Sequence, residues 1–258
     1  MPEREDHLNL AIEVFARAFA RIRSRTYPMP AIQKGDFWIL ADQPHRSKAR
    51  AAELISTNPI PQNHSKTGGR LECTRYHTCL ILTPEQEPQI LPLFKQESFR
   101  RISIEPFYTI NPAKALLTSD PRVQRVKTEE LSELVRIANQ GRSQIDPELL
   151  KIDNAAARLY AATHEDQVIG WVNSQRIEDK GNWVSNLFVH PDFRNQKLGS
   201  ALMSALLLDD ARFGVPLSVL TSSHLGTHLY PKLGYTQIAT LHMFRPPNYP
   251  RKPRELCL

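Results

Sequence analysis

The first part of the chain alternates between helical and strand-like patterns of apolar residues. Apolar positions recur at helical spacing between Leu8 and Ile22, with polar residues between them, which predicts a long amphipathic helix. The run FWILAD then predicts a short strand and HRSKARAAELI a helix, whereas residues 56–70 combine Pro, Asn, Ser and a Gly pair and predict a loop. Residues 76–109 follow as a strand, a helix and another strand.

The second part of the chain contains a longer series of elements. The run RVQRVKTEELSELVRIANQ predicts a strand and a helix with Thr128 as its N-cap, and a short helix starts at Asp146. Residues 158–189 divide into three strands separated by turns, which is typical of an antiparallel meander. An amphipathic helix over residues 199–213 comes next. The closing order is the strand PLSVLTSS, the short helix HLGTHLYPKLG and the strand YTQIATLHMF.

A linker candidate separates these two parts. The segment NPAKALLTSDPRVQRV, residues 111–126, combines two prolines with a change in the composition of the predicted elements. We therefore expect three regions: residues 1–118, residues 119–246, and a basic, Pro-rich tail over residues 247–258.

The junction between the third strand of the meander and the following helix is the strongest chemical signal. An extended apolar run stops at His190-Pro191, and the turn Arg194–Gly199 leads into the helix. The first turn of a helix has unpaired N–H groups and the positive end of the helix dipole, so such a turn favours an anion. No G-x-x-x-x-G-K-[ST] and no G-x-G-x-x-G accompanies it, which argues against nucleotide hydrolysis and dinucleotide binding.

The turn resembles the acyl-CoA signature of the GNAT N-acetyltransferase superfamily, [RQ]-x-x-G-x-[GA] after a strand reading LxVxPxxR. Arg194, Gly199 and the frame of Leu187, Val189 and Pro191 match, whereas Lys197 replaces the first glycine. The closing strand-helix-strand order is similar to the end of the GNAT domain, and the resemblance covers roughly residues 121–244. It implies an α/β (α+β) GNAT fold with a mixed, mostly antiparallel central sheet.

The resemblance also implies acetyl-CoA as co-substrate. The pyrophosphate would lie on the amides of the turn, and the pantetheine would pair with the strand before it like an added strand. Ser222 and Ser223 stand where relatives often use asparagine to hold the pantetheine, although a serine there is most often a helix cap. The expected acetyl-CoA contacts are Leu187, Phe188, Val189, Arg194, Asn195, Gln196, Lys197, Leu198, Gly199, Ser200, Ser222 and Ser223.

Tyr230 inherits the catalytic role. The run LYPKLGY is similar to the family's LYxxxGF, in which the tyrosine acts as general acid toward the CoA thiolate. A phenol with a pKa near 10 stays protonated at neutral pH and can donate its proton. The resemblance implies an N-acetyltransferase whose acceptor is a primary amine on an unidentified small molecule or peptide. A non-catalytic acyl-CoA-binding sensor or interaction module is the alternative.

The general base is not identified by the sequence. Trp183, Ser185 and Asn186 occupy strand positions where some relatives carry a glutamate or histidine. His224, His190 and Asp192 are candidates because they are near the turn or Tyr230 in the sequence. An acceptor that arrives neutral, or a water chain to a distant carboxylate, would serve instead.

The first half faintly repeats the closing segment. When CLILT is aligned with LSVLT, Phe94 stands opposite Tyr230 and Phe99 opposite Tyr235. No R-x-x-G-x-[GA] occurs there, so residues 1–118 are expected to be a smaller, degenerate GNAT-like α/β domain. We expect it to shape the acceptor cleft or a pseudo-symmetric interface.

Composition narrows the remaining classes. The net charge of +6 is uneven, and four basic residues lie in the tail after Phe244, which argues against a basic nucleic-acid-binding domain. Three cysteines form no framework and no CxxC pair, and His224 with His228 lacks the glutamate of H-E-x-x-H, so we expect no metal. No apolar run suits a signal peptide or a membrane span. We therefore expect a cytoplasmic protein without membrane contacts, with a homodimer possible.

Overall fold

The computed structural model describes residues 2–44, 50–71, 75–223, 226–247 and 249. These residues form two compact units. The first unit consists of residues 1–18 and 106–238, and the second consists of residues 19–105 and 239–258. The first unit contains the whole candidate site.

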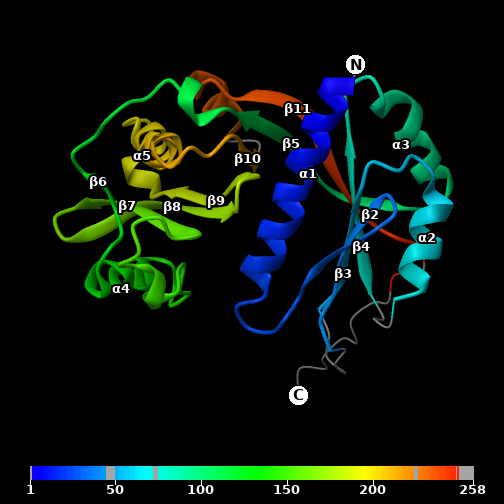
Figure 1. Ribbon diagram of the computed structural model, residues 1–258, viewed down its shortest axis with the longest axis horizontal. Coiled ribbons are helices and arrows are strands. Elements are labelled where there is room, and N and C mark those ends of the chain that lie inside the picture. Colours follow the sequence, from blue (N-terminus) through cyan, green and yellow to red (C-terminus); the bar gives the residue numbers. More distant parts are fainter. Residues whose placement is uncertain (1, 45–49, 72–74, 224–225, 248, 250–258) are drawn as a thin grey trace. The chain divides into compact units, whose positions relative to one another are not determined.

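A twisted sheet runs through the first unit in the strand order β5-β10-β9-β8-β7-β6. All neighbouring pairs are antiparallel except β10 and β9, which are parallel. Helix α5 covers one face of strands β7 to β9 and α4 covers the other (Figure 1). The strands are β5 Arg100–Ile110, β6 Val123–Arg125, β7 Ala157–His164, β8 Gln167–Ile177, β9 Gly181–Val189 and β10 Ser218–Thr221. The helices are α1 Pro2–Arg23, whose residues up to Ala18 belong to this unit, α4 Glu129–Ala138, α5 Leu198–Arg212, and the short 3-10 turns η1 Pro112–Lys114, η2 Pro147–Leu149, η3 Pro191–Phe193, η4 Gly226–His228 and η5 Tyr230–Leu233.

The alternation of side chains along the strands explains the two layers of this unit. On β8, Val172 faces α5 and belongs to the core that Leu202 and Leu206 of that helix complete. The neighbouring Trp171 faces α4 and joins a second core with Val135 of that helix. The predicted cap of α4 is confirmed, since the Thr128 hydroxyl accepts a hydrogen bond of 3.3 Å from the Leu131 N–H.

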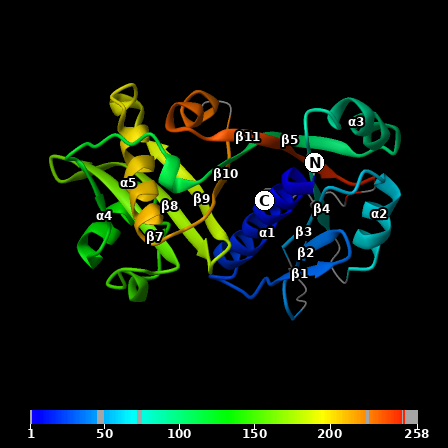
Figure 2. The same cartoon turned by 45° about the horizontal axis from the view of Figure 1, so that its top comes forward.

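The strands of the second unit follow the order β1-β2-β3-β4-β11, with helices α2 and α3 on the same side of β2 to β4 (Figure 2). Strands β3 and β4 are parallel, and the other pairs are antiparallel. Phe94 of α3 is fully buried and packs against Phe99 and Phe244. The elements are β1 Ala31–Lys34, β2 Phe37–Leu40, β3 Ala52–Ser56, α2 Pro61–Gly69, β4 Tyr76–Leu82, α3 Glu87–Gln96 and β11 Thr236–Arg245.

Two strands depart from the sequence-predicted grouping. β5 lies in the first half of the sequence, yet its residues 107–110 pair with β10 in the first unit. β11 closes the second half, yet its residues 240–244 pair with β4 in the second unit. The compact units therefore group the chain differently from residues 1–118, 119–246 and 247–258, and that division stays a prediction. Most of the expected tail lies outside the described residues.

Two predictions for the first half were wrong. Residues 52–55 were expected to end a helix, but residues 52–56 form the buried strand β3, because this segment fits between β2 and β4. Residues 56–70 were expected to be a loop, but they contain helix α2, which begins with Pro61. Its His64 is fully buried, with its ring 4.9 Å from that of Phe37 and 5.0 Å from that of Phe94, so tertiary packing overrides the weak local signal.

The expected α/β class with a mixed, mostly antiparallel sheet is confirmed. Within the described ranges, no helix combines the length and the apolar character that crossing a membrane requires. The same residues include no group of three His, Cys, Asp or Glu side chains arranged to hold a metal ion.

Candidate functional site

Strands β9 and β10 separate at the point where the sequence predicts a cofactor site. Their parallel pairing extends only from Ser218 opposite Asn182 to Val219 opposite Trp183. Beyond Trp183, β9 keeps its partner β8 on one side, and the recorded pairing with β10 on the other side has ended. The edge of β9 that faces β10 therefore opens into a wedge.

A β-bulge and the strand alternation determine which groups this edge presents. One residue of β8, Val172, is opposed by Asn186 and Leu187 of β9, and Asn186 has a φ of 55°. The N–H of His190 bonds to the carbonyl of Ile169 in β8. By alternation, the N–H and C=O groups of Leu187 and Val189 point to the opposite, open edge. This edge is suited to pair with an extended chain of amides.

The turn before α5 has an unusual backbone. Asn195 and Lys197 both have a φ of 62°, in the left-handed region. The first hydrogen bond of α5 runs from the Ala201 N–H to the Lys197 carbonyl. The N–H groups of the three residues between, 198 to 200, have no acceptor within the helix, so they are available to bind an anion at its N-terminus.

Side chains around the turn add positive charge and a fixed amide. Nε of Arg194 donates to the Val189 carbonyl at 3.2 Å, which ties the start of the turn to the open edge of β9. Arg122, the residue before β6, donates through Nη1 to Oε1 of Gln196 at 3.0 Å. Because a guanidinium only donates, this contact directs the NH₂ group of Gln196 away from Arg122 and leaves it available as a donor.

Arg122 itself is held by a bidentate ion pair. Its Nε and Nη2 donate to the two carboxylate oxygens of Asp120 at 3.0 and 2.8 Å. The side-chain hydrogen bond from Arg122 is the main cause of the lowered pKa of Asp120. Arg122 lies far from the turn in sequence, so the spacing of the motif gave no signal for it.

These elements line one groove of about 640 Å³. One wall is the end of β9 with the turn, and the other is formed by Ser223 and by residues between Gly226 and Lys232. Its lining residues are Leu187, Phe188, Val189, Phe193, Arg194, Asn195, Lys197, Leu198, Gly199, Ser200, Ser223, Gly226, His228, Leu229, Tyr230 and Lys232.

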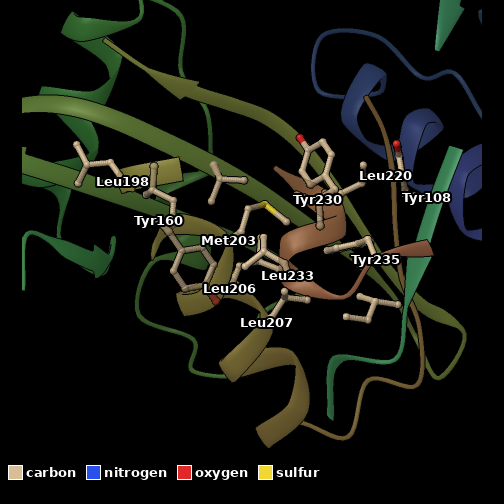
Figure 3. Close-up of a cluster of buried hydrophobic side chains, with 14 of the residues drawn as sticks. Tyr108, Tyr160, Leu198, Met203, Leu206, Leu207, Leu220, Tyr230, Leu233 and Tyr235 are labelled. Carbon is tan, nitrogen blue, oxygen red and sulfur yellow. The ribbon is translucent and has the colours of Figure 1, made fainter. Parts of the chain in front are cut away.

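Tyr230 lies at the buried end of this groove and is 7% exposed. Its ring belongs to the hydrophobic cluster between α5 and the sheet, near Tyr108 and Tyr235 (Figure 3). A Cβ on Gly226 would lie 2.9 Å from the Tyr230 ring, so only glycine fits beside it. Burial, with a smaller effect from Tyr108, raises the pKa of Tyr230 to about 12. The phenol is therefore protonated throughout the physiological range.

Comparison with known families agrees with this geometry. Residues 155–237, which include the end of β9, the turn, α5 and Tyr230, match the model of the acetyltransferase (GNAT) domain. The C-terminal half contains a GNAT domain. A search of curated proteins found no match.

Solved structures share the fold over most of the chain. A GCN5-related N-acetyltransferase from Kribbella flavida has 17% identity and a TM-score of 0.63, with 90% of this chain and 95% of that chain covered. A GCN5-related N-acetyltransferase from Sphaerobacter thermophilus has 14% identity and a TM-score of 0.55, with coverages of 83% and 78%. A tandem GNAT protein from the clavulanic acid biosynthesis pathway has 13% identity and a TM-score of 0.54, with coverages of 96% and 97%. The last similarity is consistent with a GNAT-like first half.

The structure brings most of the sequence-predicted residues of the GNAT domain to the groove. Of the expected cofactor contacts, Gln196 and Ser222 do not line it. Gln196 is exposed beside Arg122. Ser222 is buried, and its hydroxyl donates to the Ser223 carbonyl at 2.7 Å, so its position supports the loop at the end of β10. Whether any of these residues contacts a cofactor stays a prediction.

The candidates for the general base are distributed differently. His190 and Asp192 form an exposed pair 3.6 Å apart before the turn, and neither lines the groove. His224 lies outside the described residues. Trp183 is buried against Phe15, with ring centroids 4.7 Å apart.

Several groove residues were missed by the sequence analysis. Phe193, Gly226, His228, Leu229 and Lys232 all line it. Phe193 and Leu229 are ordinary apolar residues of a turn and a short helix, and nothing in their spacing marks them. Gly226 had a weak signal in the sequence, since a glycine inside a predicted helix often marks a position where another segment packs closely against the backbone.

Substitution of Lys197 tests whether the left-handed backbone of the turn before α5 is strained. The left-handed conformation costs an L-residue about 1–2 kcal/mol, whereas glycine adopts it freely but loses about 0.5–1 kcal/mol more chain entropy on folding. We expect Lys197→Gly to raise the free energy of unfolding by up to about 1 kcal/mol, measured by urea titration. Lys197→Ala, which removes the charge but keeps the Cβ, is the control. A glycine variant no more stable than the alanine variant would contradict the strained turn.

Proposed function

We propose that this protein is an acetyl-CoA-dependent N-acetyltransferase that transfers an acetyl group to a primary amine by direct attack, with Tyr230 as general acid. The observation that carries the proposal is the groove itself. It joins the unpaired N–H groups at the start of α5, the open edge of β9 and the buried phenol of Tyr230. A pyrophosphate, a chain of amides and a thioester are complementary to these three parts in that order.

The phosphate end of the groove would bind the donor through fixed groups. The N–H groups of residues 198 to 200 and the positive end of the α5 dipole favour a pyrophosphate, and the cationic side chains of Arg194 and Lys197 lie at the same end. The pantetheine amides would then pair with Leu187 and Val189, whose polar backbone groups point to the open edge. This arrangement directs the thioester toward Tyr230.

The chemical step follows from the buried end of the groove. The amine nitrogen attacks the acetyl carbonyl, the C–S bond breaks, and the sulfur takes the electron pair. The Tyr230 hydroxyl gives its proton to that sulfur, and the phenolate recovers a proton from the nitrogen, which loses one on becoming an amide. The balance requires no separate base, provided that the amine enters neutral.

The experiment offers acetyl-CoA together with a panel of primary amines: spermidine, glucosamine, lysine, kanamycin and an alanyl peptide. Release of the CoA thiol is followed with a thiol reagent, and the acetylated amine is identified by its mass. Acetyl transfer to at least one amine supports the enzyme. Acetyl-CoA binding without transfer to any of them would support the alternative, a non-catalytic acyl-CoA sensor, which is favoured by the absence of a titratable side chain at Trp183, Ser185 and Asn186. The expected cytoplasmic location and homodimer stay predictions.

A further inference from the structure

Four tyrosines lie in the cluster beside the groove, and their hydroxyl groups fall into two classes. The Tyr235 hydroxyl is 2.8 Å from the Ser218 hydroxyl, and the Tyr160 hydroxyl donates to the Asp209 carboxylate at 2.7 Å. Tyr108 and Tyr230 are equally buried, at 5% and 7% exposed. Within the described part of the chain, their hydroxyls form no hydrogen bond to another residue. Neither oxygen is one of the fully buried side-chain atoms that lack a partner, so both hydroxyls are open to a bound group or to water.

The two unpartnered phenols are neighbours. Their ring centroids are 5.9 Å apart with an interplanar angle of 47°, and both hydroxyls point to the same side of the cluster (Figure 3). Tyr230 comes from η5, and Tyr108 comes from β5, which belongs to the first half of the sequence. The pair thus joins the GNAT domain to a strand outside its family match.

The position of Tyr108 follows from the sheet register. Tyr108 pairs with Leu220 of β10, and Leu220 is the first residue beyond the last recorded pair of β10 with β9. Tyr108 therefore lies one strand away from the point where the wedge begins. Its ring forms one side of the pocket that holds the Tyr230 ring, with Tyr235 at 5.8 Å and Gly226 completing it.

We propose that Tyr108 is a positioning residue for Tyr230, and that its hydroxyl stabilises the Tyr230 oxygen while the proton of that oxygen is on the departing sulfur. This inference rests on the proposed N-acetyltransferase function. The Tyr108 hydroxyl donates a hydrogen bond toward the Tyr230 phenolate, directly or through one water, and keeps its own proton. Tyr230 then recovers a proton from the acylated nitrogen, so the sum of atoms is unchanged. In this scheme the first half of the chain contributes to the chemistry through β5.

The test compares kcat, the KM for the amine and the Kd of acetyl-CoA for the wild type, Tyr108→Phe, Tyr230→Phe and the double variant. The amine is the best acceptor of the panel. We expect Tyr108→Phe to lower kcat about tenfold, the size of one lost hydrogen bond, with KM and Kd within about twofold. In the Tyr230→Phe background, Tyr108→Phe is expected to have no further effect on kcat, because the Tyr230 oxygen that the Tyr108 hydroxyl stabilises is absent.

Tyr235→Phe is the matched control, since it removes a neighbouring hydroxyl that already bonds to Ser218. It is expected to lower thermal stability but to leave kcat within about twofold. If Tyr108→Phe loses stability, kcat is expressed per acetyl-CoA site titrated, so that only folded protein is counted. Two results would overturn this inference while leaving the proposed function intact. One is a Tyr108→Phe variant with the kcat of the wild type, and the other is a tenfold loss of kcat from Tyr108→Phe in the Tyr230→Phe background as well. A wild type that acetylates no amine would overturn the proposed function, and the inference would fall with it.

Discussion

Replacing Tyr230 with phenylalanine is expected to lower kcat by about 10²–10³-fold while the Kd of acetyl-CoA stays within about twofold, since general acid catalysis contributes about 10²–10⁴-fold. The change removes only the hydroxyl. The ring keeps its contacts with Tyr108, Tyr235 and Gly226, so the groove should keep its shape. The measurements are steady-state kinetics with the best acceptor of the amine panel and calorimetry with acetyl-CoA.

The pKa of Tyr230 determines how the proton moves. A phenol with a pKa of about 12 is a weaker acid than a free thiol, whose pKa is about 8.5, so full transfer in water would cost roughly 5 kcal/mol. Within the groove, desolvation raises the pKa of the departing thiolate as well. We therefore expect the proton to move only as the C–S bond breaks.

The raised pKa also fixes the pH dependence. Tyr230 must be protonated to act, and at pH 10 it is still almost fully protonated, so kcat should show no decline caused by Tyr230 between pH 7 and 10. Tyr235→Phe is again the control. If the Tyr230→Phe variant had the same kcat as the wild type, Tyr230 would not be the general acid.

The second large effect is expected at Asp210, where asparagine should lower the free energy of unfolding by about 3–5 kcal/mol. Asp210 of α5 is fully buried and forms an ion pair with Arg158 of β7, which is 1% exposed. Asn182 of β9 donates to the other carboxylate oxygen at 2.8 Å, and the Ser174 hydroxyl of β8 donates to Oδ1 of Asn182. The network thus links α5 to three neighbouring strands.

The size of this effect comes from the charge that would be left behind. Burial raises the pKa of Asp210 to about 6, although the Arg158 charge lowers it, so the carboxyl is ionised at neutral pH and balances the guanidinium. Nε and Nη1 of Arg158 are buried and form no hydrogen bond within the described structure, so Arg158 depends on this partner. Removal of one member of a buried pair costs far more than the net contribution of the pair.

Urea unfolding of three variants measures this effect. Asp153→Asn is the control, because Asp153 is an exposed carboxylate near Arg125, Lys127 and Arg212, and it should change stability far less than Asp210→Asn does. The double variant Arg158→Met/Asp210→Leu should recover most of the stability lost in Asp210→Asn, because an apolar pair leaves no buried charge. An Asp210→Asn variant as stable as the wild type would contradict the role of the network.

The sequence predicted the second half of the fold well because its signals are local. Thr128 as a helix cap, the meander of β7 to β9 and the junction at His190-Pro191 are each decided by neighbouring residues. The turn was predicted from Arg194, Gly199 and the strand frame before them. The left-handed conformation of Lys197 was not predicted, since lysine rarely adopts it and only the surrounding structure imposes it.

The remaining features depend on contacts between distant segments. Residues 52–56 become a strand because β2 and β4 provide partners on both sides, which the local pattern of HRSKARAAELI does not show. Arg122 meets Gln196 through the pairing of β6 with β7 rather than through any motif. Tyr108 reaches Tyr230 only because β5 pairs with β10, and the expected boundary near residue 118 separates the two.

Calorimetric titration of acetyl-CoA tests the central claim most directly, comparing the wild type with Arg194→Glu/Gly199→Asp and using desulfo-CoA as a second ligand. A Cβ at Gly199 would lie 3.4 Å from Leu229, an ordinary contact, and an acidic residue in the first turn favours the helix, so the variant should stay folded. The account predicts micromolar binding of both ligands by the wild type and loss of both in the variant, because two carboxylates would repel the pyrophosphate. Absence of binding by the wild type, or unchanged binding by the variant, would contradict a phosphate site at the start of α5.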